Sequence, residues 1–356
     1  MTLRRRPFSS TRILTSTENT SFCHFSPFFI LGPFRFTYFL KSTLWGGRDI
    51  VELKKIDGYY TVGESWEISP LPHNESLVVG GPYDGLPLHQ LIEQLREKLV
   101  GRNNFERFGN RFPLLVKFLS TAADLSIQVH PDNEMAQEEE GEANGKSECW
   151  YVVKTGQDAA LYCGFNRTVD LNTYDSATQQ GQLPGLLARY ETRPGDAFFI
   201  PAGQIHCIGA NNFIIEIQQP SDVTYRVHDF DRRDAQGNLR QLHTEKARRA
   251  LRFDESAHHH THYAPQHNTR IPLEQHPEFT TALYRIDTTY RIDYRELDSF
   301  VILIAFEGAA RLTDNENNTT LLRAGETLLY PATTQFVDVV PLEPTFSCIE
   351  TYVDAQ

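Results

Sequence analysis

Two polar residues share one face of an otherwise apolar stretch that runs from Leu125 to Asp132. The stretch is typical of a β-strand that ends in a turn, and successive side chains of a strand point to opposite faces. Gln128 and His130 therefore lie on one face together with Ser126, and their Cα atoms are about 6–7 Å apart. Because polar groups in an apolar setting need partners, this pair predicts half of a metal site.

Two further segments carry candidate metal ligands. Glu148 lies in Gly145-Lys-Ser-Glu-Cys-Trp-Tyr151, and His206 lies in Pro201-Ala-Gly-Gln-Ile-His-Cys207. Imidazole combined with oxygen ligands suits Zn²⁺ or another divalent transition metal and leaves coordination positions open for water or substrate. A single histidine in a strand is more often an ordinary core or surface residue, so the prediction depends on the four residues occurring together.

Other residues near these segments are weaker candidates. Cys149 and Cys207 stand next to Glu148 and His206, but strand alternation turns them to the opposite face, which favours buried packing over metal binding. The histidines between His258 and His262 lie in a polar, turn-rich stretch that is more typical of a solvated loop. The acidic run at 138–140 is typical of a solvated face.

The elements that must position these residues are many short apolar strands separated by glycine and proline. This pattern indicates sandwiches or barrels. We therefore expect a mainly β protein with a few helices, among them Leu88–Leu99 and His243–Leu251. An internal repeat supports two related barrels, because the G-x5-P frame of Gly195–Pro201 recurs at Gly325–Pro331.

The repeat also predicts a division of labour between the two barrels. In the second copy, Phe336 takes the position of His206 and Phe300 takes that of Glu148, so only the first barrel is expected to bind metal. We expect an extension at 1–32, a metal-binding catalytic barrel with helical segments at 33–255, and a second, metal-free barrel at 256–356.

The composition narrows the function classes. The chain has 356 residues and a net charge of −12, which argues against a nucleic-acid binder. A small phosphorylated substrate stays compatible, since it needs only a few local cations. The five cysteines are scattered with no C-x-x-C pair, so we expect a reducing, cytoplasmic compartment. No apolar run approaches the ~20 residues of a membrane helix.

The first 30 residues differ from the rest of the chain. Arginines at positions 4, 5, 6 and 12 stand among serine and threonine with no acid before Glu18, which resembles a mitochondrial transit composition. The segment has no hydrophobic period that would build a core. We favour a disordered extension or a misassigned start over targeting.

Several motifs in order carry a resemblance to a known family. The pattern G-x5-P-x-G-x2-H at 195–206 resembles the second motif of the cupin superfamily, whose fold is a jelly-roll β-barrel. More narrowly, the chain resembles type I mannose-6-phosphate isomerase in its short bacterial form from about residue 33 to the end. The motifs are Trp45-Gly-Gly, Gly63-Glu-Ser-Trp-Glu-Ile-Ser, Phe112-Pro-Leu-Leu-Val-Lys-Phe-Leu, Gln128-Val-His-Pro-Asp, Gly145-Lys-Ser-Glu-Cys-Trp-Tyr, Ile200-Pro-Ala-Gly-x-x-His and Gln218-Gln-Pro-Ser-Asp-Val-Thr-Tyr-Arg-Val.

The resemblance implies a reaction and a set of site residues. The family interconverts mannose 6-phosphate and fructose 6-phosphate through a cis-enediol and binds one zinc ion. The zinc ligands map onto Gln128, His130, Glu148 and His206. The catalytic arginine of the family maps onto Arg226, and an acid proposed as proton carrier maps onto Glu216. Polar residues that line the substrate site map onto Ser126, Lys146 and Arg232.

These residue types fit the chemistry, and some alternatives stay open. A guanidinium such as that of Arg226 can stabilise a developing enediolate, and Glu216 can transfer a proton if burial raises its pKa. Which group is the base is not decided, because Glu216 could equally be a structural acid paired with an arginine. The rival functions are a non-catalytic two-barrel cupin that binds a sugar or a partner, and a metal oxygenase. The oligomeric state, monomer or homodimer, is also left open.

Overall fold

The computed structural model describes residues 31–234, 236–253 and 259–354, and within them four large sheets carry the fold. Residues 1–30 of the extension expected at 1–32 lie outside the described residues. The first sheet has the strand order β14 (His260–Thr261), β10 (Ala197–Ile200), β7 (Glu148–Thr155), β12 (Asn212–Gln218), β5 (Leu115–Ser120), β3 (Glu64–Ile68) and β2 (Phe39–Lys41). The second sheet has the order β13 (Tyr225–His228), β6 (Ile127–Val129), β11 (His206–Ile208), β8 (Ala160–Phe165) and β9 (Leu187–Glu191).

The third and fourth sheets come from the C-terminal part of the chain. The third has the order β15 (Ile271–His276), β16 (Phe279–Ile286), β23 (Phe346–Tyr352), β18 (Val301–Glu307) and β21 (Thr327–Tyr330). The fourth has the order β17 (Tyr290–Asp293), β22 (Phe336–Pro341), β19 (Ala309–Asp314) and β20 (Thr319–Arg323). A small pair joins β1 (Arg35–Phe36) to β4 (Val78–Val79).

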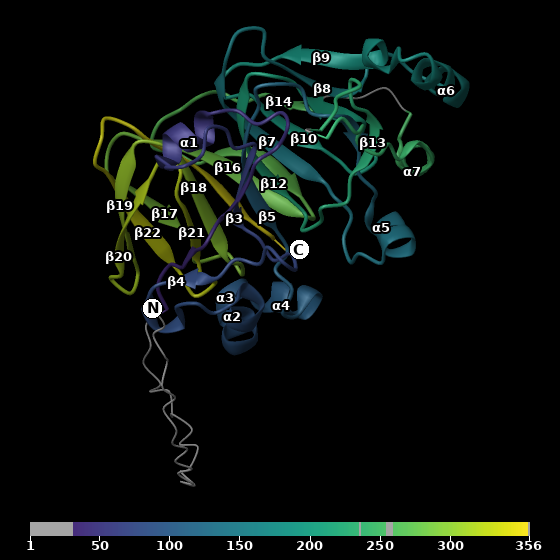
Figure 1. Ribbon diagram of the computed structural model, residues 1–356. Coiled ribbons are helices and arrows are strands. Elements are labelled where there is room, and N and C mark those ends of the chain that lie inside the picture. The colour runs from purple at the N-terminus through teal and green to yellow at the C-terminus, as the bar shows by residue number, and fades with distance from the viewer. Residues whose placement is uncertain (1–30, 235, 254–258, 355–356) are drawn as a thin grey trace, which may run out of the picture. The chain divides into compact units, whose positions relative to one another are not determined.

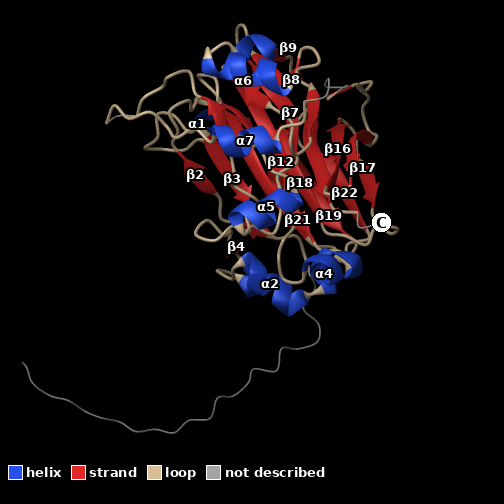
Figure 2. Ribbon diagram, turned by 90° about the vertical axis from the view of Figure 1, so that its right-hand side faces the viewer, coloured by secondary structure: helices blue, strands red, loops and turns tan. Residues whose placement is uncertain are grey.

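Helices lie around the sheets rather than between them (Figures 1 and 2). They are α1 (Asp49–Lys54), α2 (Leu88–Leu95), α3 (Glu97–Val100), α4 (Arg102–Phe108), α5 (Asn133–Glu140), α6 (Leu171–Gln179) and α7 (Thr244–Ala250), with short 3₁₀ turns at Gly81–Tyr83 and Leu183–Leu186. The second sheet, with β8, β9 and β13, and the fourth sheet, with β19 and β20, lie at opposite ends of the view in Figure 1. The prediction of a mainly β protein with a few helices is confirmed.

The four sheets are stacked in the order second, first, third and fourth, and an apolar layer lies between each sheet and the next. Apolar side chains of the first and second sheets meet in one interior, which includes Trp150, Phe198 and Ile208. Those of the third and fourth sheets meet in another, which includes Leu303 and Val339. The outer faces of the first and third sheets pack on each other. Strand alternation makes this possible, since the inner strands of the two central sheets, such as β5, β12, β16 and β23, are buried on both faces.

The internal repeat is visible in the strand order. The run β10-β7-β12-β5-β3 of the first sheet has the same form as β21-β18-β23-β16-β15 of the third, and β6-β11-β8-β9 of the second matches β17-β22-β19-β20 of the fourth. The two G-x5-P frames lead into β10 and β21. The chain thus contains two sheet pairs of like topology. That each pair is a cupin-type jelly-roll barrel, with the boundary at 255/256, stays a prediction.

The expected counterpart of Glu148 is wrong by one residue. Glu148 pairs with Ile200 just before the proline of the first frame, whereas Tyr330 before the second proline pairs with Val301. Val301 faces the interior of the second sheet pair, and Phe300 instead packs between the first and third sheets. Because alternation has period two, a one-residue slip in the alignment exchanges the faces. Phe336 does begin β22 as His206 begins β11.

The helix expected at Leu88–Leu99 is interrupted. Arg96 adopts φ 51° and separates α2 from α3. The break turns the chain so that Leu99 and Val100 are buried on the same core as Leu91. The Arg96 guanidinium lies 4.4 Å from the centre of the Phe105 ring. In the described ranges no helix is long and apolar enough to cross a membrane, and the cytoplasmic location stays a prediction.

One glycine fixes how the helical segment meets the C-terminal sheets. Gly101, between α3 and α4, has φ 90°, and a Cβ at this position would lie 2.2 Å from the backbone oxygen of Asp298. The Asp298 carboxylate in turn accepts hydrogen bonds from the backbone nitrogens of Arg102 and Asn103, at 3.0 and 3.2 Å. A side chain at 101 would therefore push α4 away from the acid that caps it.

We predict that Gly101→Ala lowers the free energy of unfolding by more than Gly109→Ala does. Gly109 also has a positive φ, 62°, but open space around its Cα. Its substitution should cost only the backbone strain, of order 1–3 kcal/mol, whereas Gly101→Ala adds the clash with Asp298. Urea unfolding of the two variants measures the difference. Equal losses would show that the Asp298 contact does not constrain the fold.

Candidate active site

Three site residues form a row across the second sheet. Gln128 of β6 is the direct cross-strand partner of His206 of β11 on one side and of Arg226 of β13 on the other. Directly opposite residues in antiparallel strands project to the same face. The short strand predicted from Leu125 to Asp132 therefore places Gln128 at the centre of this row, and His130 follows immediately after β6.

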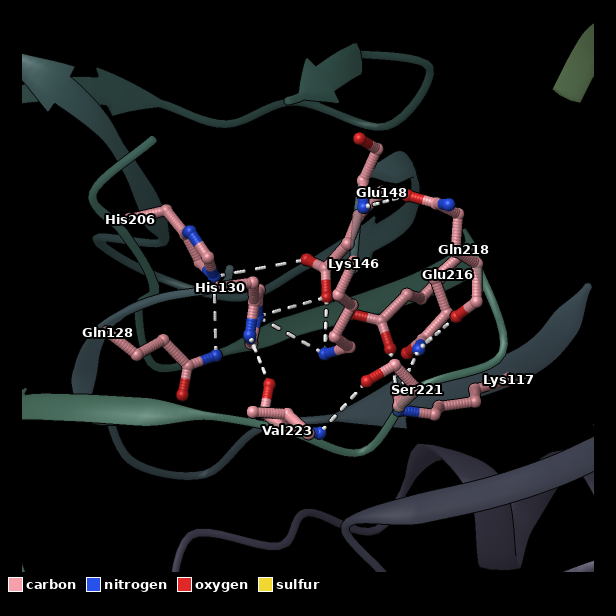
Figure 3. Close-up of polar contacts among 12 residues, drawn as sticks. Lys117, Gln128, His130, Lys146, Glu148, His206, Glu216, Gln218, Ser221 and Val223 are labelled. Atoms are coloured by element: carbon pink, nitrogen blue, oxygen red, sulfur yellow. Dashed lines mark hydrogen bonds and ion pairs between the residues drawn. The ribbon is translucent and has the colours of Figure 1, made fainter. Parts of the chain in front are cut away.

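The first sheet supplies the residues that face this row. Glu148 and Trp150 of β7 are the cross-strand partners of Gln218 and Glu216 of β12. Glu216 is in turn opposite Lys117 of β5. Two sheets thus close on one interior, and Figure 3 shows the side chains of both converging there.

Three of the predicted ligands meet at one point. The ligand atoms of His130, Glu148 and His206 all lie within 4.8 Å of one another. His130 Nε2 is 3.3 Å from Glu148 Oε1, and His206 Nε2 is 3.9 Å from Glu148 Oε2. Each of the three residues is about 1% exposed. Two imidazole nitrogens and a carboxylate at these separations can hold one divalent transition metal.

Backbone carbonyls fix the tautomer of both histidines. His130 Nδ1 is 2.8 Å from the carbonyl oxygen of Val223, and His206 Nδ1 is 2.9 Å from that of Gln204. A carbonyl oxygen can only accept, so Nδ1 carries the hydrogen and donates it. Burial lowers the pKa of both imidazoles, that of His206 to about 3. Both rings are therefore neutral, with the lone pair of Nε2 facing Glu148, which is the state a metal ligand needs.

Gln128 lies where a fourth ligand would stand. Its Nε2 is 3.3 Å from His206 Nε2, and its Oε1 accepts a hydrogen bond of 3.1 Å from the Ser126 hydroxyl. The oxygen and nitrogen of an amide exchange places when the group rotates by half a turn. The rotated amide would direct its oxygen to the side of His206 and keep a donor for Ser126, so this residue fits a metal ligand set.

Lys146 adds positive charge to the same set. Its Nζ lies 2.5 Å from Glu148 Oε1 and 3.2 Å from His130 Nε2. Burial alone would raise the pKa of Glu148, but the positive charge of Lys146 and the contact with His130 outweigh burial and hold that pKa well below its usual range. Glu148 is therefore a carboxylate at neutral pH, as cation binding requires.

The pKa of the second buried acid, Glu216, is shifted in the opposite direction to that of Glu148. Burial and the charge of Glu148 raise the pKa of Glu216, although Lys117 opposes the shift. Lys117 Nζ is 3.0 Å from Glu216 Oε2, and both side chains are at most 5% exposed. The indole nitrogen of Trp150 is 3.1 Å from Glu148 Oε2 and 3.1 Å from Glu216 Oε1. The indole therefore bridges the two acids.

The two predicted arginines lie on or after β13. Arg226 donates from Nη1 to the carbonyl oxygen of Gln241 at 2.8 Å, and its buried Nε has no hydrogen-bond partner among the described residues. Arg232 contacts the Asp229 carboxylate and the carbonyl oxygen of Asp124. No hydrogen bond in the described part of the chain joins Arg232 to the four predicted metal ligands.

Comparison with known proteins identifies the family. The model of the type I phosphomannose isomerase catalytic domain matches residues 34–163. The mannose-6-phosphate isomerase ManA of Bacillus subtilis is 32% identical over 286 residues, which are 80% of this chain and 88% of that protein. This chain belongs to the mannose-6-phosphate isomerases. The enzyme of that name from Streptococcus mutans is 35% identical and aligns over 83% of this chain and 90% of its own length.

Solved structures agree with this assignment to the mannose-6-phosphate isomerases. The mannose 6-phosphate isomerase of Bacillus subtilis is 30% identical with a TM-score of 0.80, covering 90% of this chain and 99% of that one. A putative mannosephosphate isomerase of Archaeoglobus fulgidus, at 24% identity and a TM-score of 0.71 over 91% of this chain and 98% of that one, shares the fold. The family expected from the motifs is confirmed, and a non-catalytic cupin or an oxygenase has no support.

Two residues that the sequence reasoning missed hold the site together, namely Lys117 and Trp150. The signal for Lys117 was present, because it is the one charged residue in the apolar strand motif at 112–119. Its partner could not be read from the sequence, since Glu216 is opposite Lys117 only through the strand order. Glu216 is thus paired with a lysine and not with the arginine that the structural alternative assumed.

The weaker candidates fall outside the metal-ligand set. Cys149 Sγ faces Thr281 Oγ1 of the third sheet at 3.7 Å, and Cys207 Sγ donates to the carbonyl oxygen of Leu125. His258 lies outside the described residues. His260 is half-buried in β14 and pairs with Asp196 at 3.3 Å, so it is not in a solvated loop. The acidic run at 138–140 was expected to be a solvated face, but two of its side chains form ion pairs. Glu140 pairs with Lys246 at 2.6 Å, and Glu139 contacts Arg249.

We predict that His206→Ala removes the bound metal, because it deletes one of two imidazole ligands in a buried set. His276→Ala is the matched control, since His276 also pairs with an acid, Glu274 at 2.9 Å, but on the third sheet. Metal content per chain, measured by mass spectrometry after dialysis, should fall in the first variant alone. Full metal content in His206→Ala would contradict the proposed ligand set.

We also predict strong coupling between Lys117 and Glu216. Lys117→Met leaves a buried carboxylate without its ion pair and should cost about 3–5 kcal/mol. Combining it with Glu216→Gln removes the stranded charge, so the double variant should be more stable than Lys117→Met alone. Urea unfolding of the four proteins of this cycle measures the coupling. Simple additivity would mean that the pair does not stabilise the interior.

Proposed function

We propose that this chain interconverts mannose 6-phosphate and fructose 6-phosphate by moving a proton between C1 and C2 through a cis-enediol. One observation carries the proposal most directly. The ligand atoms of His130, Glu148 and His206 converge within 4.8 Å in a chain that belongs to the mannose-6-phosphate isomerases. The convergence lies inside the sheet pair formed by segments that carry the family motifs.

The ligand set supports one Zn²⁺ ion as the cofactor. Gln128, His130, Glu148 and His206 would hold it through two imidazole nitrogens, a carboxylate and an amide oxygen, a mixture that suits zinc. A divalent cation bound there polarises a carbonyl or enediolate oxygen of the sugar. With the cation bound, the ammonium of Lys146 would be repelled from Glu148 and would turn to an anionic substrate.

Glu216 is the proposed proton carrier. Burial and the nearby Glu148 raise its pKa, which makes the carboxylate a stronger base than that of an exposed glutamate and lets the carboxyl hold the proton until it is returned to the sugar. Trp150 holds Oε1 of Glu216 at 3.1 Å and Lys117 holds Oε2 at 3.0 Å. The carboxylate is therefore fixed in orientation, so that a proton can leave C2 and return to C1 on one face of the enediol.

Arg226 is the proposed electrostatic stabiliser of the enediolate. Its position opposite Gln128 directs the guanidinium to the same interior as the metal ligands, and its unpartnered Nε leaves a buried donor free for an oxyanion. Preorganised donors of this kind act strongly where water is excluded. Ser126, Lys146 and Arg232 are the proposed contacts to the hydroxyl and phosphate groups of the sugar.

We predict activity in an assay that couples fructose 6-phosphate formation from mannose 6-phosphate to a dye. Chelation should abolish turnover, and added Zn²⁺ should restore it. No turnover by the fully metal-loaded protein would refute the proposed function.

Arg226→Ala should keep its metal and lose about 10²–10³-fold in kcat. The matched control is Arg311→Ala on the exposed face of β19, which should leave kcat unchanged. The same assay with metal content measured in parallel separates a lost catalytic group from a lost metal. Near-normal kcat in Arg226→Ala would remove this residue from the mechanism.

A further inference from the structure

Two hydrogen bonds close the loop that follows β13 by joining His243, at its far end, to Arg226 of the strand. The backbone nitrogen of His243 donates to the carbonyl oxygen of Arg226 at 2.7 Å, and the backbone nitrogen of Arg226 donates to His243 Nδ1 at 3.2 Å. Within the loop, the carbonyl oxygen of Gln241 holds the Arg226 guanidinium. The chain from Asp229 to Gln241 therefore determines where that guanidinium lies.

A single acid, Asp229, organises the loop from inside. Its side chain is 6% exposed, and it binds Arg240 in the two-pronged geometry typical of arginine and carboxylate, with Nε to Oδ2 at 2.7 Å and Nη2 to Oδ1. Arg232 Nη2 contacts the same Oδ1. Arg232 also contacts the carbonyl oxygen of Asp124, just before Leu125 and β6. One carboxylate thus joins the loop to the segment that carries Ser126 and Gln128.

The Asp229 cluster, which we define as Asp229, Arg226, Arg232 and Arg240, has an excess of positive charge. Two guanidiniums, those of Arg232 and Arg240, bind the one carboxylate, and that of Arg226 lies close enough to be influenced by its charge, so the cluster carries two net positive charges. Burial first, and then the charge of Arg240, lowers the pKa of Arg226, as expected for crowded cations. The other loop acids do not cancel the excess within the cluster, because Asp231 is exposed and Asp234 caps its own turn.

The cluster is open enough to receive a ligand. The side chains of Arg232 and Arg240 are 18% and 27% exposed, so both guanidiniums can be reached from solvent. Guanidinium groups bind phosphate oxygens in pairs with good geometry. A dianion would neutralise the two excess charges, whereas a neutral sugar would not.

The backbone of the loop is strained, which points to a function. Phe230 and Asp231 have φ values of 55° and 53°, a region that costs a residue with a side chain about 1–2 kcal/mol. The strain lies directly between Asp229 and Arg232, whose ion pair spans it. Such strain persists where surrounding contacts overdetermine the conformation, often at ligand sites.

We propose that Asp229 is a positioning residue that gathers Arg232 and Arg240, beside Arg226, into the anion site for the phosphate group of the substrate. Arg240 is the new member of this site, since the motifs pointed only to Arg226 and Arg232. The inference rests on the proposed function in one respect, namely that the dianion is the phosphate of a sugar. The anion site itself can be tested without turnover.

The variant Asp229→Asn distinguishes two roles of the acid. Asp229 either positions the arginines for phosphate or only lowers the positive charge that attracts it. The variant makes the cluster more positive, so attraction alone would tighten phosphate binding. If Asp229 positions the arginines, the amide cannot hold Arg240 through two bonds, the guanidiniums repel one another, and phosphate binding weakens. Losing one charge-assisted contact corresponds to about 10-fold or more in affinity. Arg240→Gln should weaken binding in the same direction, and Arg240→Lys should restore part of it.

The experiment uses inorganic phosphate as the probe on the full, metal-loaded chain. Calorimetry gives its dissociation constant, and the inhibition constant and the KM for mannose 6-phosphate follow from the coupled assay. We expect both variants to raise these three constants by a larger factor than they lower kcat, while metal content does not change. The matched control is Asp338→Asn, which breaks a two-pronged pair with Arg291, at 2.7 Å twice, in the fourth sheet and should change none of them.

The outcomes distinguish the two proposals. Unchanged or tighter phosphate binding in Asp229→Asn and Arg240→Gln would overturn the positioning role. Weaker phosphate binding in both variants, together with no isomerase activity of the metal-loaded wild-type chain, would uphold the anion site and refute the proposed function. If Asp229→Asn does not fold, which its unfolding temperature would show, phosphate binding by Arg240→Gln still tests the anion site. Arg240 is partly exposed, so its substitution should not unfold the chain.

Discussion

The structure depends on burying two carboxylates and two ammonium groups in one closed interior. Glu148, Glu216, Lys117 and Lys146 are each at most 5% exposed by side chain, and an unpaired ion in such a place costs several kcal/mol. The pairing of the strands places a lysine beside each acid. Lys117 is directly opposite Glu216, and Lys146 precedes Glu148 by two residues on the same face. The charges balance, and the neutral histidines add none. Each buried acid therefore has its own lysine, which offsets the cost of burying its charge.

The two carboxylates nevertheless differ in character. Lys146 and His130 hold the pKa of Glu148 down, while burial and the charge of Glu148 itself raise the pKa of Glu216. Acids with opposed pKa tendencies in one site commonly have different roles. The pattern supports the proposed roles, metal ligand for Glu148 and proton transfer for Glu216. Trp150, bonded to both, fixes the distance across which one acid influences the other.

The sequence predicted well what depends on local period and failed where strand order decides. Alternation placed Gln128 with His130 on one face, and the motifs gave the family. The partner of Lys117 could not be found, because β5 and β12 become neighbours only in the folded sheet. The role of Asp229 was hidden for the same reason, since Arg240 returns to it through a loop. The one-residue error at Phe300 arose where an aligned repeat carries no information on register.

The repeat shows how far one topology can diverge in chemistry. In the first sheet pair Trp150 is opposite Glu216, and at the equivalent place in the second Leu303 is opposite Glu350. Glu350 is likewise buried, but it accepts hydrogen bonds from the hydroxyls of Tyr284 and Tyr294 and pairs with Arg270 at 2.8 Å. The same strand position thus keeps a buried acid whose every neighbour has changed. Glu350 thus has three donors, whereas Glu216 has two, Trp150 and Lys117, and a second buried acid beside it. The proposed role of Glu216 therefore depends on its neighbours Glu148 and Lys117, and not on its place in the fold.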